Sequence, residues 1–300
     1  MSFLSKKAKQ LQVNDQQVEN LGKVTSDKAV DIIKKLSGVD NNSKGTLVDN
    51  YIVMTNVSGG TGTSTLTSNV AYAAACQGLK VLVIDLNILC PIQHTFLGIK
   101  QSVTEKPDLV SYILGRNNIG DCIDSSHAYS VMYANNRTIA DLINCNADAS
   151  INTYNDMINK LRRLYDLILV DCPMILENTL CNNALYTCDS MYVVWDEGLS
   201  AIANTDRLRR NMSYCGIDSY TKMRIILNKR THIHYNMYPF KKLNLELVEV
   251  LPFDTAVIEN SLKAQIFCEK ASSNSKNAAI FENSIRSLTD KILKIGGMVR

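Results

Sequence analysis

The residues best suited to chemistry form a glycine-rich run that follows an apolar segment and opens a helical one. Its sequence over residues 58–65 is Ser-Gly-Gly-Thr-Gly-Thr-Ser-Thr. In the phosphate-binding pattern G-x-x-x-x-G-K-[ST], backbone N–H groups and a helix N-terminus hold phosphate, the lysine grips the outer phosphates, and the hydroxyl binds magnesium. Thr63 stands here at the lysine position, which predicts an anion cradle without that point charge. The predicted binding residues of the loop are Ser58, Gly59, Gly60, Thr61, Gly62, Thr63, Ser64 and Thr65.

Two carboxylates follow apolar runs that are typical of buried strands. Asp85 ends the run Val-Leu-Val-Ile, and Asp171 ends Leu-Ile-Leu-Val. Magnesium keeps most of its water and takes few protein oxygens, so two carboxylates at one sheet edge beside a phosphate chain would suit it. The alternative is that both are solvated strand-end aspartates. Together with the glycine loop they predict a Mg²⁺ site of Ser64, Asp85 and Asp171, bound directly or through water.

Apolar runs rich in β-formers alternate with helical stretches along most of the chain. This alternation predicts an α/β fold, a mostly parallel sheet with helices on both faces, in which ligands bind beyond the carboxyl ends of the strands. The expected strands are 51–55, 81–85, 167–171, 191–195, 223–227 and 247–251, and the expected helices are 64–77, 108–114, 152–164, 201–212 and 278–293.

The first fifty residues differ in texture from the rest. Residues 1–50 are rich in lysine, asparagine and glutamine, and Ser26 could cap one helical stretch with Ala29, Ile33 and Leu36 on one face. This tail could be a tether or docking helix, or a helix packed on the domain or a disordered leader. The expected organisation is a polar, partly helical tail over 1–50 and one domain over 51–300.

The composition says more about the cellular compartment of the protein than about its binding partners. The net charge of +3 over 300 residues demands neither nucleic acid nor an acidic membrane. Nine cysteines without a C-x-x-C pair indicate reduced thiols rather than a disulfide framework. No apolar run approaches the roughly 18 residues that span a bilayer, and the N-terminus has no apolar signal core. We expect a cytoplasmic protein, which is either free in the cytoplasm or in peripheral contact with the inner face of the membrane.

Several segments in order resemble the MinD/ParA group of P-loop ATPases. They are SGGTGTST, VLVID, YDLILVDCP, ILNK and LPFD, and the group's loop has the form K-G-G-x-G-K-[ST]-T. Residues 108–115 resemble the helix that follows the first switch segment in this family. Residues 188–194 resemble the strand that precedes the second half of the family's domain. The resemblance covers about residues 51–295. It implies the P-loop NTPase fold of the SIMIBI class and, as cofactors, ATP and Mg²⁺.

The same resemblance implies a homodimer that sandwiches ATP, in which the first loop lysine reaches the partner's nucleotide and the second grips its own. Ser58 and Thr63 replace these lysines, and Asn87 replaces an acid that helps to orient the attacking water beside Asp85. Phosphoryl transfer depends on positioning and on stabilising negative charge, so weak or absent hydrolysis is expected. Losing one charge-assisted hydrogen bond, roughly 1.5–3 kcal/mol, would weaken ATP binding about ten- to a hundredfold without preventing it.

Three states of the loop remain open at this point. It could be an empty relic that packs strand against helix, it could bind nucleotide without efficient turnover, or Lys229, Arg230 or a partner's arginine could restore hydrolysis. By resemblance, the strand-end segments around Asn228 and Lys229 and around Pro252 and Asp254 would border the adenine. An asparagine that merely closes a strand into a turn is the alternative for Asn228.

Three surface features suggest further partners. The basic helix with Arg207, Arg209 and Arg210, and the cluster 160–163, could hold DNA non-specifically or could simply be solvated. An apolar stripe at positions 281, 285, 288, 292 and 295 could form a MinD-like membrane helix or pack on the sheet. His232 and His234 could ligate metal or be ordinary loop histidines.

These features favour a dimeric spatial-positioning or scaffold factor with a degenerate catalytic site. Among family branches the chain resembles the TadZ/CpaE-like group of pilus or secretion assembly, where atypical Walker loops are characteristic, which implies protein partners from a membrane-associated or pilus machine. The alternative is a ParA-type DNA-partitioning ATPase. A third is a tyrosine-kinase-like domain of capsule synthesis, against which residues 291–300 offer no tyrosine cluster.

Overall fold

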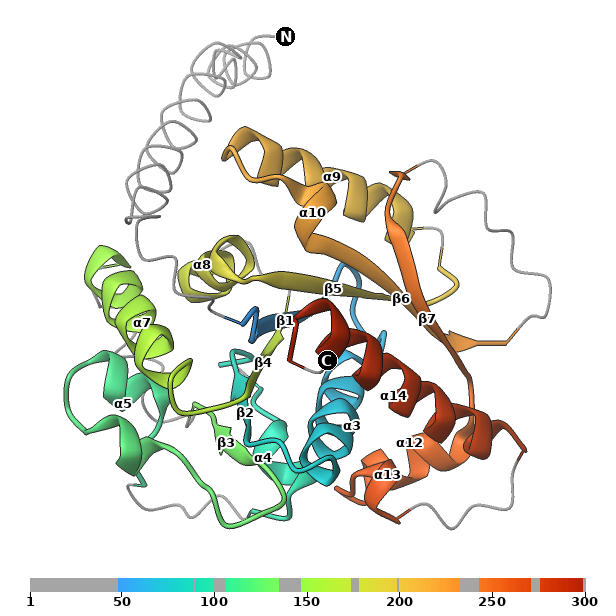
Figure 1. Ribbon diagram of the computed structural model, residues 1–300, viewed down its shortest axis with the longest axis horizontal. Coiled ribbons are helices and arrows are strands. Elements are labelled where there is room, and N and C mark those ends of the chain that lie inside the picture. Colours follow the sequence, from blue (N-terminus) through green and yellow to red (C-terminus); the bar gives the residue numbers. More distant parts are fainter. Residues whose placement is uncertain are drawn as a thin grey trace, which may run out of the picture.

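The computed structural model describes residues 48–88, 90–99, 106–134, 147–173, 178–198, 200–231, 243–270 and 276–298, with side chains from 150 onward in the fourth range. The expected helical stretch near Ser26 and both loop histidines, His232 and His234, lie outside the described residues. Within them the chain folds as one sheet with helices on either side (Figure 1).

The sheet has seven strands, and every pairing between neighbours is parallel. Its order is β3-β2-β4-β1-β5-β6-β7, with β1 in the centre. Most of these strands read as continuous apolar runs because helices cover both of their faces. The strands are β1 Tyr51–Asn56, β2 Val81–Asp85, β3 Ser130–Met132, β4 Leu167–Cys172, β5 Ser190–Trp195, β6 Met223–Arg230 and β7 Glu246–Pro252.

Helices bury one apolar stripe each against the two faces of the sheet. On one face the core includes side chains from α5 Leu109–Ile113, α7 Ala147–Leu161, α8 Thr179–Thr187 and α9 Ser200–Tyr214. The other core includes side chains from α3 Thr63–Cys76, α4 Gln93–Phe96, α13 Phe267–Lys270 and α14 Lys276–Ile295. Shorter elements are η2 Ile119–Cys122, α10 Ser219–Lys222 and α12 Thr255–Leu262. In Figure 1, α3 and α14 lie side by side, and they are in contact.

The six expected strands are all present, and the parallel α/β fold is confirmed. The helix expected over 152–164 runs instead over Ala147–Leu161 and ends in a turn before β4. The helix expected over 108–114 is capped at both predicted ends, with a reciprocal capping box between Asp108 and Ser111. The edge strand β3 and the short helices were not predicted, because they are short or lack a clear apolar period; these helices are α4, η2, α8, α10, α12 and α13.

Register brings the two strand-end carboxylates together. β2 and β4 are neighbours, and Asp85 is the direct cross-strand partner of Asp171. On the other side of β4, Asp171 lies opposite Met54 of β1, the strand that leads into the glycine loop. The loop and both carboxylates therefore share one edge of the sheet, as parallel topology requires.

Candidate nucleotide and cation site

Two glycines give the loop a shape that other residues would resist. Gly60 and Gly62 have φ of 79° and 90°, and Gly62 is the left-handed N-cap of α3. A Cβ at Gly62 would lie 2.6 Å from Asn228 Nδ2, closer than real contacts allow. No side chain caps the first turn of α3, and no acidic residue lies in it. Its N–H groups and positive dipole end are therefore suited to an anion.

Side chains from two neighbouring elements hold the loop from outside through its carbonyl groups. Asn204 Nδ2 on α9 donates to Val57 O at 2.8 Å, and Asn228 Nδ2 on β6 donates to Thr61 O at 2.8 Å. Lys229 Nζ donates to Gly60 O at 2.5 Å. These three bonds engage carbonyl oxygens and leave the loop's N–H groups to a ligand, so the cradle keeps its form without a lysine of its own.

Lys229 reaches the loop through an unusual backbone. Its φ is 56°, a left-handed value that is uncommon for a residue with a Cβ. The ladder between β6 and β7 changes register between Leu227 and Arg230, so Lys229 sits at this irregularity. The side chain passes Gly62, with Cε 3.6 Å from the point where a Cβ of Gly62 would lie. An ammonium group therefore borders the loop, although from β6 rather than from the lysine position.

The side chains at the family's two lysine positions are uncharged, and only that of Thr63 has a hydrogen-bond partner among the described residues. Thr63 is buried and its Oγ1 lies 3.2 Å from Thr61 Oγ1. Within the described residues, Ser58 Oγ is one of the few buried side-chain polar atoms without a hydrogen-bond partner. Thr65 Oγ1 lies 3.3 Å from Ser261 Oγ, which ties the first turn of α3 to α12. No charge enters the loop from its own sequence.

Asp85 is fully buried and anchors the segment that follows β2. Its Oδ1 accepts from the N–H of Asn87 at 2.9 Å, and its Oδ2 accepts from the N–H groups of Ile92 at 2.8 Å and Gln93 at 2.9 Å. Burial, and then the charge of Asp171, raise the pKa of Asp85 to about 8 against these bonds. Asn87 is half-buried and contributes its backbone N–H to this anchor.

Asp171 faces the loop helix and a side chain that the sequence did not single out. Gln93 Nε2 donates to Asp171 Oδ2 at 2.7 Å and also reaches Ser64 O at 3.0 Å. Burial raises the pKa of Asp171, while side-chain hydrogen bonds from Gln93 and Ser64 lower it. The structure thus brings Ser64, Asp85 and Asp171 together, with Gln93 between them.

The donor set at this edge fits a hydrated magnesium ion rather than a tightly coordinated metal. Within the described ranges no group of three or more His, Cys, Asp or Glu side chains could hold a metal. One hydroxyl, two carboxylates and the unpartnered amide oxygen of Gln93 could instead receive the waters that magnesium retains beside a phosphate. With Mg²⁺ and a nucleotide bound, Ser64 and Asp171 would hold the ion, and the ion would offset part of the negative charge of the phosphates.

The remaining predicted nucleotide contacts have structural partners. Asn228 is buried, with its amide nitrogen on Thr61 O. Pro252 ends β7 opposite Arg230, and Asp254 Oδ1 caps α12 by accepting from the N–H of Ala256 at 2.7 Å. Asn228 therefore contacts the loop directly, whereas the described contacts of Pro252 and Asp254 are with β6 and α12.

The basic and apolar surface features have mostly internal partners. Arg209 and Arg210 both pair with Asp206, and Arg209 also donates to Leu243 O. The apolar stripe of α14 is buried against β7 and α3, as expected of a helix that packs on the sheet. No helix among the described residues is long and apolar enough to cross a membrane.

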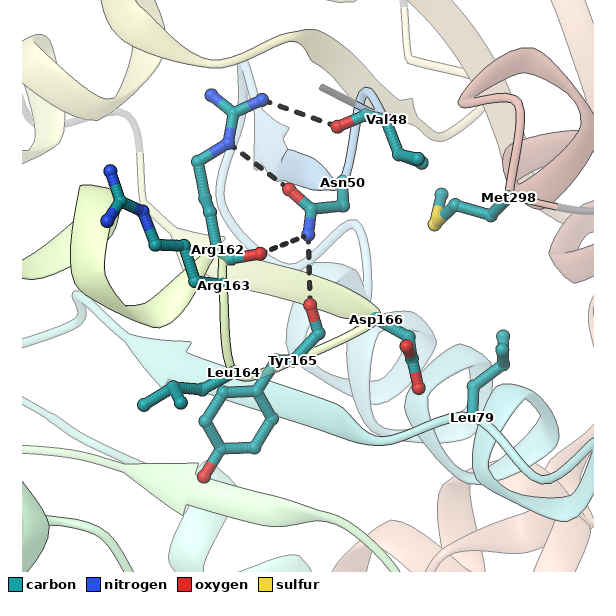
Figure 2. Close-up of a pocket in the computed structure, with 9 residues that line it drawn as sticks. All are labelled: Val48, Asn50, Leu79, Arg162, Arg163, Leu164, Tyr165, Asp166 and Met298. Carbon is teal, nitrogen blue, oxygen red and sulfur yellow. Dashed lines mark hydrogen bonds between the residues drawn. The ribbon is translucent and has the colours of Figure 1, made fainter. Parts of the chain in front are cut away.

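A separate cavity of about 350 Å³ lies at the opposite end of the sheet (Figure 2). Val48, Leu79 and Met298 supply apolar lining, and Asn50 bridges Arg162 and Tyr165 through hydrogen bonds. Figure 2 shows the Arg162 guanidinium turned toward Val48 and Asn50, while that of Arg163 points elsewhere. This cavity is remote from the loop and contains none of the residues predicted to bind nucleotide or magnesium, although Arg162 and Arg163 of the basic cluster 160–163 line it.

Gln93 is the functional candidate that sequence reasoning missed. It lies eight residues after Asp85, beyond Pro91, in a stretch with neither strand alternation nor a long helical period. Only the fold shows that it returns to both carboxylates.

A central parallel sheet, a glycine loop entering α3, and paired carboxylates at the same edge define the MinD/ParA type of P-loop NTPase fold. A family model described as an AAA domain (AAA_31) matches residues 49–223, and the chain belongs to this family.

Known relatives agree with this class. Septum site-determining protein MinD of Bacillus subtilis is 24% identical over 218 residues, covering 70% of this chain and 78% of that protein. Tyrosine-protein kinase CpsD of Streptococcus pneumoniae is 23% identical over 167 residues, covering 55% of this chain and 70% of the kinase. The structure of MinD complexed with Mg-ADP from Pyrococcus horikoshii has a TM-score of 0.66 at 21% identity, covering 82% and 97% of the two chains.

Proposed function

We propose that this chain is a MinD/ParA-like nucleotide-binding protein that hydrolyses ATP weakly or not at all and acts as a dimeric positioning or scaffold factor. In this proposal its role resembles that of TadZ/CpaE-like proteins in pilus or secretion assembly. The partners would be a second copy of the chain and proteins of a membrane-associated machine, with peripheral contact at the inner face of the membrane.

One observation carries the proposal: the cradle is held in shape although its lysine positions are neutral. Asn204, Asn228 and Lys229 each engage a loop carbonyl, whereas Thr63 only contacts Thr61. A loop used merely to pack strand against helix would not need three side chains that leave its N–H groups to an anion. Binding therefore survives on main-chain geometry, while the charges that act most in the transition state are missing.

Magnesium and ATP are the proposed ligands. The solved structure of Pyrococcus horikoshii MinD contains Mg-ADP, so a protein of this fold holds magnesium together with an adenine nucleotide. In this chain the loop residues 58–65 would hold the phosphates, Asn228, Lys229, Pro252 and Asp254 would border the base, and Ser64, Asp85 and Asp171 would face the ion. Asn87 would leave the attacking water without its second acid.

The DNA-partitioning alternative receives less support from the described surface. Arg209 is only 20% exposed, pairs with Asp206 and also donates to Leu243 O, so this arginine is held within the domain rather than presented to DNA. A partition ATPase would show phosphate release that DNA stimulates and that falls steeply with salt.

The decisive experiment combines nucleotide binding with turnover. A fluorescent ATP analogue should bind the wild-type chain, and Gly62→Ala should weaken binding at least about tenfold because its Cβ meets Asn228 Nδ2 at 2.6 Å. Gly78→Ala is the matched control, since Gly78 also has positive φ, at 86°, but has open space around it. Light scattering should show dimers with ATP, while a phosphate-release assay should show little turnover with or without DNA.

Three results would count against the proposal. No binding by the wild-type chain would leave the loop as a packing relic. Robust turnover would mean that another group supplies the missing charge. DNA-stimulated turnover would favour the partition alternative.

A further inference from the structure

Gln93 is the first residue of α4 and is completely buried at the sheet edge between β2, β4 and α3. Its amide nitrogen contacts two acceptors at once, the carboxylate of Asp171 at 2.7 Å and the carbonyl of Ser64 at 3.0 Å. One uncharged side chain therefore joins the strand-end acid to the first turn of the loop helix.

The backbone of the same residue joins the second acid. The N–H groups of Ile92 and Gln93 both donate to Asp85 Oδ2. Because Asp85 and Asp171 are cross-strand partners, Gln93 contacts both carboxylates, one through its main chain and one through its amide. Any change in the distance between α3 and β4 would act directly on this residue.

The orientation of the amide follows from its neighbours. Both Asp171 Oδ2 and Ser64 O are acceptors, so the nitrogen must face them and the oxygen must point away. That oxygen, Oε1, is buried and has no hydrogen-bond partner in the described structure. An unpaired buried acceptor is unfavourable, so an arrangement that supplies a donor is favoured.

Among the described residues, this oxygen is the buried unpartnered atom that belongs to a side chain in direct contact with the acids. The carboxylate pair is suited to a hydrated cation, whose waters could donate to this oxygen.

We propose that Gln93 is a positioning residue of the cation site: its nitrogen orients Asp171, and its oxygen accepts a hydrogen bond from a water of the Mg²⁺ held at Ser64. This role rests on the proposed nucleotide binding. Residues that hold the ligands of a metal in place change the affinity of the site for that metal, commonly by 10- to 100-fold.

The test measures how strongly Mg²⁺ tightens nucleotide binding. A fluorescent ATP analogue is titrated with Mg²⁺ and again with EDTA, and the ratio of the two Kd values is compared among variants. Gln93→Leu should reduce this ratio at least about tenfold, since it removes both the nitrogen and the oxygen at similar volume. Gln93→Glu should increase the ratio, because a carboxylate facing Asp171 and Ser64 O repels them unless a cation intervenes.

A matched control comes from the surface of α3. Gln77 Nε2 donates to Asp290 Oδ1 at 2.8 Å, which is the same kind of bond in an exposed place, so Gln77→Leu should leave the ratio unchanged. Thermal unfolding of each variant identifies loss of folding, and if Gln93→Leu does not fold, the more isosteric Gln93→Glu decides the outcome.

The outcomes separate the two proposals. If the wild-type chain binds nucleotide with a Mg²⁺ effect that both Gln93 variants preserve, the role of Gln93 is overturned and the proposed function stands. If the wild-type chain binds no nucleotide with or without Mg²⁺, both are overturned.

Discussion

The two ends of the sheet each hold a polar network, and the described side chains of the two networks differ in how fully they are hydrogen-bonded. At the amino end, Asn50 donates to Arg162 O and Tyr165 O and accepts from Arg162 Nε, while Arg162 Nη2 contacts Asp189 Oδ2 at 2.7 Å (Figure 2). At the carboxyl end, Ser58 Oγ and Gln93 Oε1 are buried without partners.

This difference separates structure from function in physical terms. Buried polar groups are normally paired, and a network whose members are all bonded rigidifies a fold. The Arg162 network closes on itself and ties β1, α7, β4 and β5 together. The loop end retains hydrogen-bonding capacity that the protein does not use, as a binding site requires. We therefore interpret the cavity of Figure 2 as structural and the loop edge as the functional site.

The largest expected effect comes from breaking the closed network. Arg162→Leu leaves Asp189 without its ion-pair partner, although that side chain is only 14% exposed, and removes the bond to Asn50. We expect a loss of about 2–3 kcal/mol in the free energy of unfolding, measured with urea, and no change in nucleotide affinity.

Arg163→Leu is the control for this change. Its side chain is exposed, lines the same cavity and points away from the network in Figure 2, so its unfolding free energy should stay within about 0.5 kcal/mol of the wild type. If Arg162→Leu lost most of its nucleotide binding but kept normal stability, the assignment of a structural role to the amino end and a binding role to the carboxyl end would be contradicted.

At the carboxyl end of the sheet, which holds the glycine loop, an added positive charge should change nucleotide affinity. Thr63→Lys restores the loop lysine, and one charge-assisted hydrogen bond of roughly 1.5–3 kcal/mol should raise ATP affinity about ten- to a hundredfold in a titration. Thr65→Lys adds the same charge in the same turn of α3 but at the wrong position, and should gain much less. Equal gains in ATP affinity for the two variants would mean that only the net charge of the loop matters. No gain for Thr63→Lys would mean that the loop is closed to nucleotide.

The fold could be predicted from the sequence because its signals are local and repeated. Continuous apolar runs such as 81–84 and 167–170 specify buried parallel strands, and the polar residue that ends each run marks the ligand edge. Asp85 and Asp171 were therefore expected at one edge, and their register pairing agrees.

The contacts that complete the site could not be predicted in this way. Gln93 and Asn204 belong to no sequence motif, and only tertiary packing brings their side chains to the loop. Lys229 was a candidate by position, but its bond to Gly60 O depends on a left-handed backbone and a register irregularity in β6. The short strand β3 has too few residues for alternation to be visible.

A further prediction concerns the proton on Asp85. The folded-state pKa of Asp85 is about 8 because burial and Asp171 disfavour its charge, whereas a carboxyl in the unfolded chain titrates near 4. Between these values the unfolded chain binds fewer protons than the folded one, so stability falls as pH rises from about 4 to about 8. Urea unfolding at pH 5, 6.5 and 8 should show this fall, and Asp85→Asn should flatten it.

Asp124→Asn is the control for this pH slope. Burial raises the pKa of Asp124, but hydrogen bonds from Lys106 and Ser126 outweigh it and hold the pKa below the ordinary value. Its contribution is therefore complete above about pH 4 and is lost only as pH falls further, so this variant should keep the wild-type slope between pH 5 and 8. Stability that rises over this range in the wild type would show that Asp85 is ionised in the folded chain. The three backbone N–H bonds would then outweigh burial, and the open end would carry a charge ready for a cation.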